Sequence, residues 1–324
     1  MMKVGMVGAG HIAGKMARTI AAMPDFTNYA IASRDLAKAQ AFASEFGMQK
    51  AYGSYEELYA DPEVELVYIA TPHSHHFAQA RMALEAGKPV LCEKAFTANA
   101  REAESLFELS RIRGVFICEA VWTRFMPLSM KIRELIEGGA IGRPRQLSAT
   151  LCYPMEQKER ILRPELCGGV LLDLSIYGIN FARMYFGNDI VRVDSSCVKG
   201  ETGVDMYETI TLGWRDGRMA NLVSSAYTRC NRLGLICGDE GYIEVENMNI
   251  VSAVRVFKDY RKVAEFFPPE TQINGYEYEL RACRDAVRNG WVESPYMPHS
   301  ETLEIMKMMD ALRAEWGVRY PMDE

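Results

Sequence analysis

The segment Lys3-Val4-Gly5-Met6-Val7-Gly8-Ala9-Gly10-His11-Ile12-Ala13 decides the fold of the first part of the chain. A short apolar strand runs into a glycine turn, and the turn opens directly into a helix. Gly8 allows the tight turn, and Gly10 lets the backbone come close to a bound group. Ala13 stands where helix and strand pack, a position that needs a small side chain. This order predicts the start of a βαβ unit.

The alternation of strands and helices continues to about residue 120. Short apolar runs predict buried strands at residues 3–7, 29–32, 66–69, 90–92 and 116–118. Helices are predicted between them at 35–46, 77–86 and 100–113, and another begins at Ser54. Their end signals are Asp35 as an N-cap, Ser54 with Glu57 as a capping box, and Gly87 and Gly114 after helix ends. The pattern predicts an α/β, doubly wound parallel sheet of the Rossmann type.

Beyond about Phe125 the pattern changes. Helices are predicted at 127–137, 169–185, 276–288 and 301–316, and strands fill most of 190–263. Asp216-Gly217, between apolar runs at 210–214 and 219–224, is a strong hairpin signal, and Asp239-Glu240-Gly241 suggests another. We therefore expect an α+β C-terminal domain built on a large, open, mostly antiparallel sheet.

Length and composition exclude several classes of protein. The 324 residues exceed the ~250–300 at which single cores stop growing, so two domains are expected. With 37 basic and 43 acidic residues, a net charge of -6 and no dense basic block, nucleic acid is not an expected partner. No run of about 18 apolar residues occurs, and the start lacks a cleavage site, so we expect a cytoplasmic protein without a membrane partner.

The cysteine and histidine patterns do not predict a metal site. Eight cysteines are scattered without a C-x-x-C pair, which indicates buried, reduced thiols. His73, His75 and His76 lie close in sequence, but no H-E-x-x-H or distant partner motif accompanies them. We therefore expect no metal.

The glycine turn predicts a dinucleotide site. Its G-x-G-x-x-A pattern is weak evidence by itself, because any strand-turn-helix can use glycine for the turn alone. Its place at the start of a βαβ alternation strengthens the prediction, since a pyrophosphate would meet the backbone of residues 8–12 and the helix dipole there.

The end of the second strand favours NADP. An NAD site places Asp or Glu there to bind the ribose 2′-OH, but Ser33 and Arg34 follow this strand. Asp35 is the exception to weigh, although it starts the next helix and is better placed as an N-cap. Ser33 offers a hydrogen bond and Arg34 a cation to a 2′-phosphate. The alternatives are a solvated Arg34 and NAD as cofactor.

Four motifs resemble, in order and spacing, those of the Gfo/Idh/MocA oxidoreductases. They are Gly8-Ala9-Gly10, the run Ala70-Thr71-Pro72-His73-Ser74-His75-His76, Glu93-Lys94, and residues 168–177 with Asp173 and Tyr177. The resemblance covers nearly the whole chain. Residues 119–125 and 202–205 are similar to the branch that holds dimeric trans-dihydrodiol dehydrogenases and NADP-dependent D-xylose dehydrogenases. The family usually has proline after its lysine, whereas Ala95 follows Lys94 here.

The resemblance implies an NAD(P)-binding Rossmann domain at 1–122 and a substrate-binding and dimerisation domain at 123–324, whose last helix can pack back on the first. It implies a catalytic trio of Lys94, Asp173 and Tyr177. The implied cofactor-binding residues are Gly8, Ala9, Gly10, His11, Ile12, Ser33, Arg34, Thr71, Pro72, His73, His76, Glu93, Lys94, Trp122 and Arg124. The implied substrate residues are Trp122, Phe125, Tyr153, Asp173 and Tyr177.

The residues themselves support part of this assignment. Lys94 lies just beyond a predicted parallel strand, at the edge where such sheets bind ligands. Asp173 is a charge in an apolar run, which is costly unless it is paired, and Tyr177 four residues later shares its helix face. The alternatives are a solvated lysine for Lys94 and ordinary core roles for Tyr177, Trp122 and Phe125.

The chemistry of a CH–OH oxidation needs a group that takes the hydroxyl proton. Tyr177 suits this role if the Lys94 ammonium favours its phenolate and Asp173 holds Lys94. Lys94 as the direct acid/base is the alternative, and the sequence does not choose between them.

The sequence therefore predicts an NADP-dependent dehydrogenase for a sugar or cyclic diol, assembled as a homodimer through its C-terminal sheet. Two other functions remain open: a redox-assisted glycoside-cleaving enzyme that retains NAD(P), and a non-catalytic NADP(H) sensor.

Overall fold

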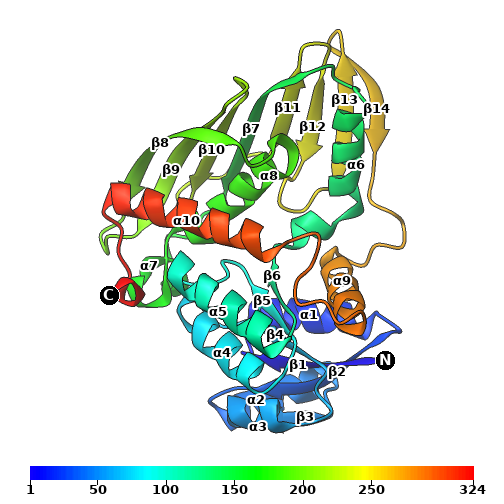
Figure 1. Ribbon diagram of the computed structural model, residues 1–324, viewed down its shortest axis with the longest axis vertical. Helices are drawn as coiled ribbons and strands as arrows, with labels where there is room; N and C mark the ends of the chain where they lie inside the picture. The colour runs from blue at the N-terminus through cyan, green and yellow to red at the C-terminus, as the bar shows by residue number, and fades with distance from the viewer. The chain divides into compact units, whose positions relative to one another are not determined.

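The computed structural model describes residues 1–324, and the chain divides into two compact units, each with its own sheet (Figure 1). Unit 1 comprises residues 1–122, 273–307 and 323. Unit 2 comprises residues 123–272, 308–322 and 324. Part of the C-terminal segment thus belongs to the same unit as the N-terminal residues.

Unit 1 contains a parallel sheet of six strands in the order β3-β2-β1-β4-β5-β6. The strands are β1 Met2–Val7, β2 Phe26–Ala32, β3 Lys50–Tyr52, β4 Leu66–Ile69, β5 Val90–Glu93 and β6 Ile117–Ala120. This is the doubly wound order of dinucleotide-binding folds, so the predicted Rossmann sheet is confirmed. The edge strand β3 was not predicted, because three partly exposed residues carry no apolar pattern.

The helices of unit 1 begin where their caps predict, with one exception. They are α1 His11–Ala21, α2 Leu36–Phe46, α3 Tyr55–Ala60, α4 His73–Glu85, α5 Ala100–Arg113 and α9 Tyr276–Arg288. The Asp35 carboxylate accepts from Lys38 N at 3.2 Å, and the Ser54 hydroxyl accepts from Glu57 N at 3.3 Å. The predicted start of α4 at residue 77 is wrong, because Pro72 is the N-cap and the polar histidine run forms the first turn.

Unit 2 contains an eight-stranded sheet in the order β14-β13-β12-β11-β7-β10-β9-β8. The strands are β7 Pro144–Cys152, β8 Ile190–Lys199, β9 Asp205–Trp214, β10 Met219–Ser225, β11 Gly234–Gly238, β12 Tyr242–Glu246, β13 Ala253–Lys258 and β14 Arg261–Phe266. Only the β7–β10 pair is parallel, which confirms the large, mostly antiparallel sheet. Both predicted hairpins are present, as β9–β10 and β11–β12.

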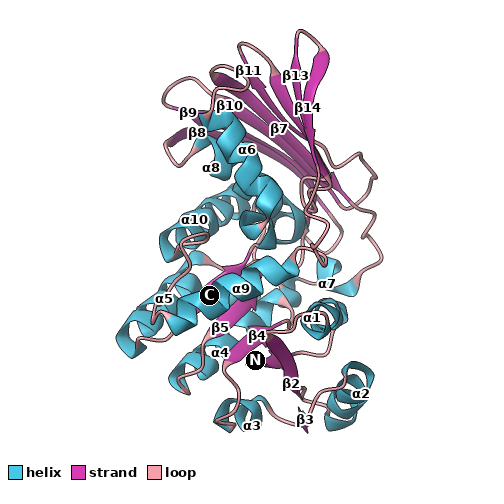
Figure 2. Cartoon of the chain, turned by 90° about the vertical axis from the view of Figure 1, so that its right-hand side faces the viewer, coloured by secondary structure: helices cyan, strands magenta, loops and turns pink.

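One face of this sheet is covered by helices. α6 Pro127–Glu137 packs on β13, and α8 Ile176–Phe186 packs on β7 and β10 (Figure 2). The helix predicted at 169–185 has two parts, because a π-helix, η3 Leu171–Ser175, precedes α8. The remaining helical elements are η1 Trp122–Phe125, α7 Glu159–Leu162, η2 Pro164–Leu166, α10 His299–Trp316, which contributes to both units, and η4 Pro321–Asp323.

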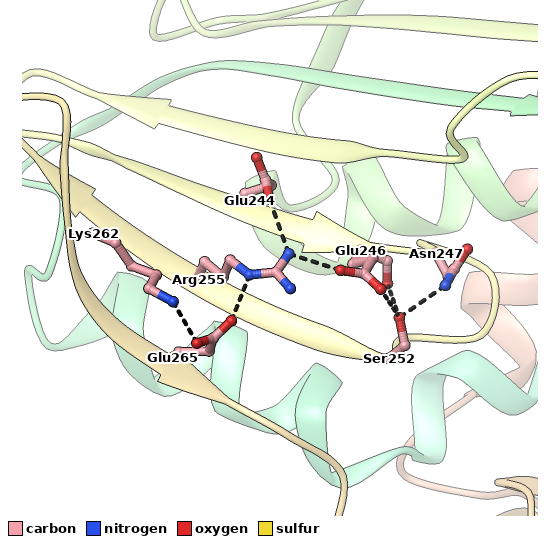
Figure 3. A network of polar contacts seen from close by, with 7 residues as sticks. All are labelled: Glu244, Glu246, Asn247, Ser252, Arg255, Lys262 and Glu265. Carbon is pink, nitrogen blue, oxygen red and sulfur yellow. Dashed lines mark hydrogen bonds and ion pairs between the residues drawn. The ribbon is translucent and has the colours of Figure 1, made fainter.

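The opposite face of the sheet is mixed in character. Val198, Tyr207 and Met219 are exposed at its β8–β10 side. At the β12–β14 side, Arg255 contacts the carboxylates of Glu244, Glu246 and Glu265 at 3.1, 2.8 and 2.6 Å (Figure 3). The expectation of an open apolar face therefore holds for one side only, since ion pairs occupy the other.

The helical stretch 164–186 is long and apolar enough, by length and composition, to cross a membrane. However, 83% of its apolar window is buried inside the structure. The core helix of a globular protein meets the same criteria, so this is weak evidence for a membrane span.

Candidate active site

Two loops meet at the point where the order of the parallel sheet reverses. β1 and β4 are neighbours, with Val7 opposite Ile69, and each strand ends at the same edge. Gly8 has φ +95°, and a Cβ there would lie 2.9 Å from the carbonyl oxygen of Ala70. Only glycine therefore allows the two loops to approach this closely, at the place where open α/β sheets bind ligands.

The N-terminus of α1 opens at this edge. Gly10 is its N-cap and supplies no side-chain hydrogen bond to the first turn. The nearest atom to a Cβ at Gly10 would be the Ala70 carbonyl oxygen at 4.0 Å, so there is space in front of the helix. An uncapped helix N-terminus with open space presents N–H groups and a positive dipole end to an anion.

Two buried hydroxyl groups lie beside the neighbouring helix start. Pro72 caps α4 without a side-chain hydrogen bond. The hydroxyl oxygens of Thr71 and Ser74 are buried and have no hydrogen-bond partner. Because unpaired buried hydroxyls are costly, these groups fit a polar ligand. Together with the uncapped α1, this donor set fits a dinucleotide.

The end of β2 carries the residues that distinguish the two nicotinamide cofactors. The buried Ser33 accepts a hydrogen bond from Asp35 N at 3.3 Å, while Asp35 caps α2. Arg34 is exposed. Burial lowers the pKa of His75, and the positive charge of Arg34 lowers it further, so Arg34 lies within electrostatic reach of the first turn of α4.

His76 holds the backbone next to this edge. Its Nδ1 lies 2.9 Å from the Ala95 carbonyl oxygen and its Nε2 lies 2.8 Å from the Thr71 carbonyl oxygen. Burial lowers its pKa, and a neutral imidazole donates to one of these two carbonyls. The His73 ring meets it edge to face at 5.7 Å. Each ring nitrogen of His76 thus lies within hydrogen-bond distance of a backbone carbonyl oxygen, and the protonated nitrogen donates to one of them.

The residue after Lys94 is fixed from two sides. The Lys94-Ala95 peptide bond is cis. The Ala95 carbonyl faces His76, and the next amide, Phe96 N, donates to the buried Glu119 carboxylate at 3.0 Å. Lys94 thus follows β5 on a turn held by two buried side chains, at the same edge as Gly8.

Two buried carboxyl groups of unit 1, those of Glu93 and Glu279, interact with each other electrostatically. Glu93 is buried and accepts a hydrogen bond from the Tyr68 hydroxyl. Glu279 of α9 is fully buried, and neither of its carboxyl oxygens has a hydrogen-bond partner. Burial raises the pKa of Glu279 well above its ordinary value, and the charge of Glu93 adds to this rise. Burial therefore favours the protonated, neutral form of Glu279.

Trp122 completes the predicted residues of unit 1. It is buried, and its ring stacks on Tyr276 with centroids 4.4 Å apart and planes 6° from parallel. This contact joins the end of the N-terminal segment to α9.

The remaining predicted residues lie in unit 2, where Asp173 and Tyr177 follow each other along η3 and α8. Asp173 is buried and Tyr177 is half-buried. Both oxygens of Asp173 accept hydrogen bonds from Arg160, at 2.7 Å from Nη1 and 3.0 Å from Nη2. This is a bidentate guanidinium-carboxylate pair, the strong form of such contacts. Sequence analysis missed Arg160, although a charged Asp173 in an apolar run requires a partner.

Asp205 supports the start of this helix. Its Oδ2 accepts hydrogen bonds from Val170 N and Leu171 N, each at 2.6 Å. Gly169, with φ +109°, packs against the same carboxylate, and a Cβ there would collide with it. The position therefore requires glycine.

The other predicted residues of unit 2 have varied surroundings. The Tyr153 hydroxyl accepts from Arg232 at 3.0 Å and from Asn249 at 3.2 Å, two residues that sequence analysis also missed. Arg124 is buried and donates to Asn180 of α8 at 2.6 Å. Phe125 is buried.

Comparisons with known proteins identify the family. Residues 2–120 match a family model described as "Oxidoreductase family, NAD-binding Rossmann fold", and residues 129–244 match "GFO/IDH/MocA C-terminal domain". The chain belongs to the Gfo/Idh/MocA oxidoreductases. This confirms the family expected from the sequence motifs. The chain is therefore an NAD(P)-dependent dehydrogenase.

Relatives in this family cover the full chain. The trans-1,2-dihydrobenzene-1,2-diol dehydrogenase of Oryctolagus cuniculus is 34% identical, over 98% of this chain and 100% of the relative. The Homo sapiens protein of the same name is 32% identical, over 100% and 99%. Among solved structures, a 3-ketoreductase from Actinomadura kijaniata in complex with NADP has a TM-score of 0.88 and 26% identity, and 97% of each chain is covered.

The Glu279 carboxyl group predicts a specific pH dependence of stability. Its pKa is raised in the folded state, so the folded protein holds this proton more tightly and loses stability as pH rises above ~4.3, the ordinary pKa of glutamate. Glu279→Gln keeps the neutral shape and removes this loss. We expect the variant to exceed the wild type in free energy of unfolding at pH 8, with the margin closing toward pH 4. Denaturant unfolding across this range measures it.

The exposed Glu108 of α5 provides the control. Glu108→Gln should track the wild type at every pH. A Glu279→Gln variant that is less stable than the wild type at pH 8 would show that the carboxyl group is ionised and paired.

Proposed function

We propose that this enzyme transfers a hydride between NADP(H) and a hydroxyl or carbonyl carbon of a small sugar or cyclic diol. The observation that carries the proposal is the donor set at the ends of β1 and β4, where an open helix N-terminus adjoins the unpaired Thr71 and Ser74 hydroxyls. Relatives named as a diol dehydrogenase and as a 3-ketoreductase support the substrate class. Turnover of NADP+ with a panel of sugars and diols tests it, and release of free NADPH separates it from a glycoside-cleaving enzyme that retains its cofactor.

The cofactor would be held by residues of the parallel-sheet edge. The backbone of Gly8, Ala9, Gly10, His11 and Ile12 suits the pyrophosphate, because its amides precede and open α1. The 2′-phosphate would meet Ser33 and Arg34. The further cofactor residues of the proposal are Thr71, Pro72, His73, His76, Glu93, Lys94, Trp122 and Arg124. The nicotinamide, when bound, supplies the hydride acceptor or donor.

We propose that Tyr177 is the acid/base residue of the reaction. Its phenolate would take the proton of the substrate hydroxyl, and the ammonium of Lys94 would favour that phenolate. Asp173 would hold Lys94 in place, and Trp122, Phe125 and Tyr153 would contact the substrate. In this proposal residues 1–122 bind the cofactor, while residues 123–324 bind the substrate and form the dimer.

The cofactor preference is tested by Arg34→Ala. The exposed Arg34 would make a charge-assisted contact to a 2′-phosphate, worth about 1.5–3 kcal/mol. We expect the Kd for NADP to rise about tenfold or more while the Kd for NAD stays unchanged, as measured by fluorescence titration. Because NAD serves as the internal control, an equal loss for both cofactors would refute the assignment.

The acid/base assignment is tested by Tyr177→Phe and Lys94→Ala. A positioned acid/base contributes about 10²–10⁴-fold, so single-turnover hydride transfer in Tyr177→Phe should fall by that order at unchanged NADP affinity. Lys94→Ala should be at least as damaging. Near-normal transfer in Tyr177→Phe together with loss in Lys94→Ala would make Lys94 the acid/base.

We further propose a cytoplasmic homodimer. All eight cysteines are free thiols, which suits a reducing compartment. The uncovered sheet face of unit 2 offers Val198, Tyr207 and Met219 to a second copy, and apolar side chains exposed together suit a self-complementary contact.

The dimer is tested by Tyr207→Glu, which places a charge on this face. Sedimentation should show a dimer for the wild type at micromolar concentration and a monomer for the variant. Ile112→Glu, at an exposed apolar residue of α5, is the control and should remain dimeric. A monomeric wild type would contradict the proposal.

A further inference from the structure

Arg160 is a charged residue that neither the sequence motifs nor the proposed reaction uses. It lies on α7, in the segment that leads from β7 to the glycine pair Gly168-Gly169. Its guanidinium reaches both oxygens of Asp173, at 2.7 and 3.0 Å. The Asp173 side chain is 8% exposed and the Arg160 side chain 46%, so the cation covers a nearly buried carboxylate from the solvent side.

The guanidinium of Arg160 also interacts electrostatically with Tyr177. Burial lowers the pKa of Arg160, but Asp173 and the Tyr177 hydroxyl raise it by more, so the pKa lies above its ordinary value. Asp173 and Tyr177 are four residues apart across the junction of η3 and α8, and so share one face. A π-helical turn at this point is of the kind often found at functional sites. The positive charge of Arg160 therefore lies against Asp173 and within electrostatic reach of Tyr177.

Other ionisable groups also lie around this helix start. Asp205 of β9 accepts two backbone amides of η3. Burial raises the pKa of Asp205 and raises that of its buried neighbour Glu208 well above the ordinary value, and the charge of Asp205 adds to the rise at Glu208. Arg124 pairs with Asn180, about one turn beyond Tyr177. Within unit 2, Arg160 is a cation that contacts Asp173 directly through both carboxylate oxygens, and Lys94 is the second cation of the proposed reaction.

We propose that Arg160 is a positioning residue for Tyr177: it fixes Asp173 through a bidentate contact and places a permanent positive charge beside the phenolic oxygen. This inference rests on the proposed role of Tyr177 as proton acceptor. No proton moves to or from Arg160, because a guanidinium stays charged across the working pH range. Without it, the positive charge near Asp173 and the phenol would be smaller, which would disfavour formation of the phenolate.

A direct titration tests the inference without any turnover. Tyrosinate absorbance is followed against pH, and the difference between a protein and its Tyr177→Phe derivative isolates this one tyrosine among 16. In Arg160→Gln we expect the midpoint to move to higher pH by about 1–3 units, the usual effect of an opposite charge at short range. Arg160→Met, which is uncharged and of similar length, should shift it the same way. Arg160→Lys should keep most of the wild-type midpoint.

The matched control is Arg163→Gln. Arg163 is a cation on the same segment that pairs with Glu159 at 2.7 Å, and its loss should leave the midpoint unchanged. A midpoint in folded Arg160→Gln and Arg160→Met equal to that of the wild type would overturn the inference. An equal shift in Arg163→Gln would also overturn it, because the effect would then belong to the general charge of the segment.

The pH profile of hydride transfer gives the second readout. Arg160→Gln should lose about tenfold in rate at neutral pH for each unit of midpoint shift and recover at alkaline pH, whereas a merely structural role lowers the rate equally at all pH values. A uniform loss would therefore contradict the inference. Absence of turnover in the wild type with every sugar and diol would instead refute the proposed function, and the tyrosinate titration would still decide the role of Arg160.

Discussion

The close approach of Gly8 to the carbonyl of Ala70 is the constraint on which the cofactor half of this protein depends. It occurs where β1 and β4 diverge, and it leaves no room for a Cβ. Because the two loops touch there, the N-termini of α1 and α4 open at the same edge, and neither helix is capped by a side chain. The proposed pyrophosphate site thus consists of backbone amides and two hydroxyls, all of them neutral donors. In this proposal the pyrophosphate is bound through the orientation of these donors rather than by a cluster of cations, and Arg34 is reserved for the 2′-phosphate.

Several carboxyl groups are buried in this protein, and they differ in whether they have hydrogen-bond partners. Asp205 accepts hydrogen bonds from two backbone amides at the start of η3, which oppose the rise in its pKa that burial causes, and Asp173 accepts two hydrogen bonds from Arg160. Glu279 and Glu208 have no such partner, and burial raises the pKa of each well above its ordinary value. A buried carboxylate is stable only with strong partners, so the unpaired acids keep their protons. The negative charges that remain are those that organise helices or loops near the proposed reacting groups.

Sequence patterns predicted the fold well wherever local chemistry decides it. The parallel sheet, the caps Asp35 and Ser54 and the Asp216-Gly217 hairpin follow from apolar runs and turn residues. Two strands were missed. β3 is short, with three partly exposed residues. β7 is longer, and its Leu147, Ala149 and Leu151 alternate with polar residues, but it stands apart from the other predicted strands, between a helix and a long loop. The π-helical turn before α8 has the same apolar composition as an α-helix, so periodicity does not distinguish them.

The candidate site shows the same division between local and distant information. Gly8, Gly10 and Lys94 were predictable because each lies next to a strand end, whose place in a parallel sheet is fixed by the fold. Arg160, Arg232 and Asn249 were not, because their partners Asp173 and Tyr153 lie 13 to 96 residues away and only the folded chain joins them. The position of Asp173 nevertheless predicts a partner, because burial of an ionised carboxylate without one costs free energy. A charge that the local sequence leaves unbalanced therefore indicates a missing cation, and in unit 2 that cation is Arg160.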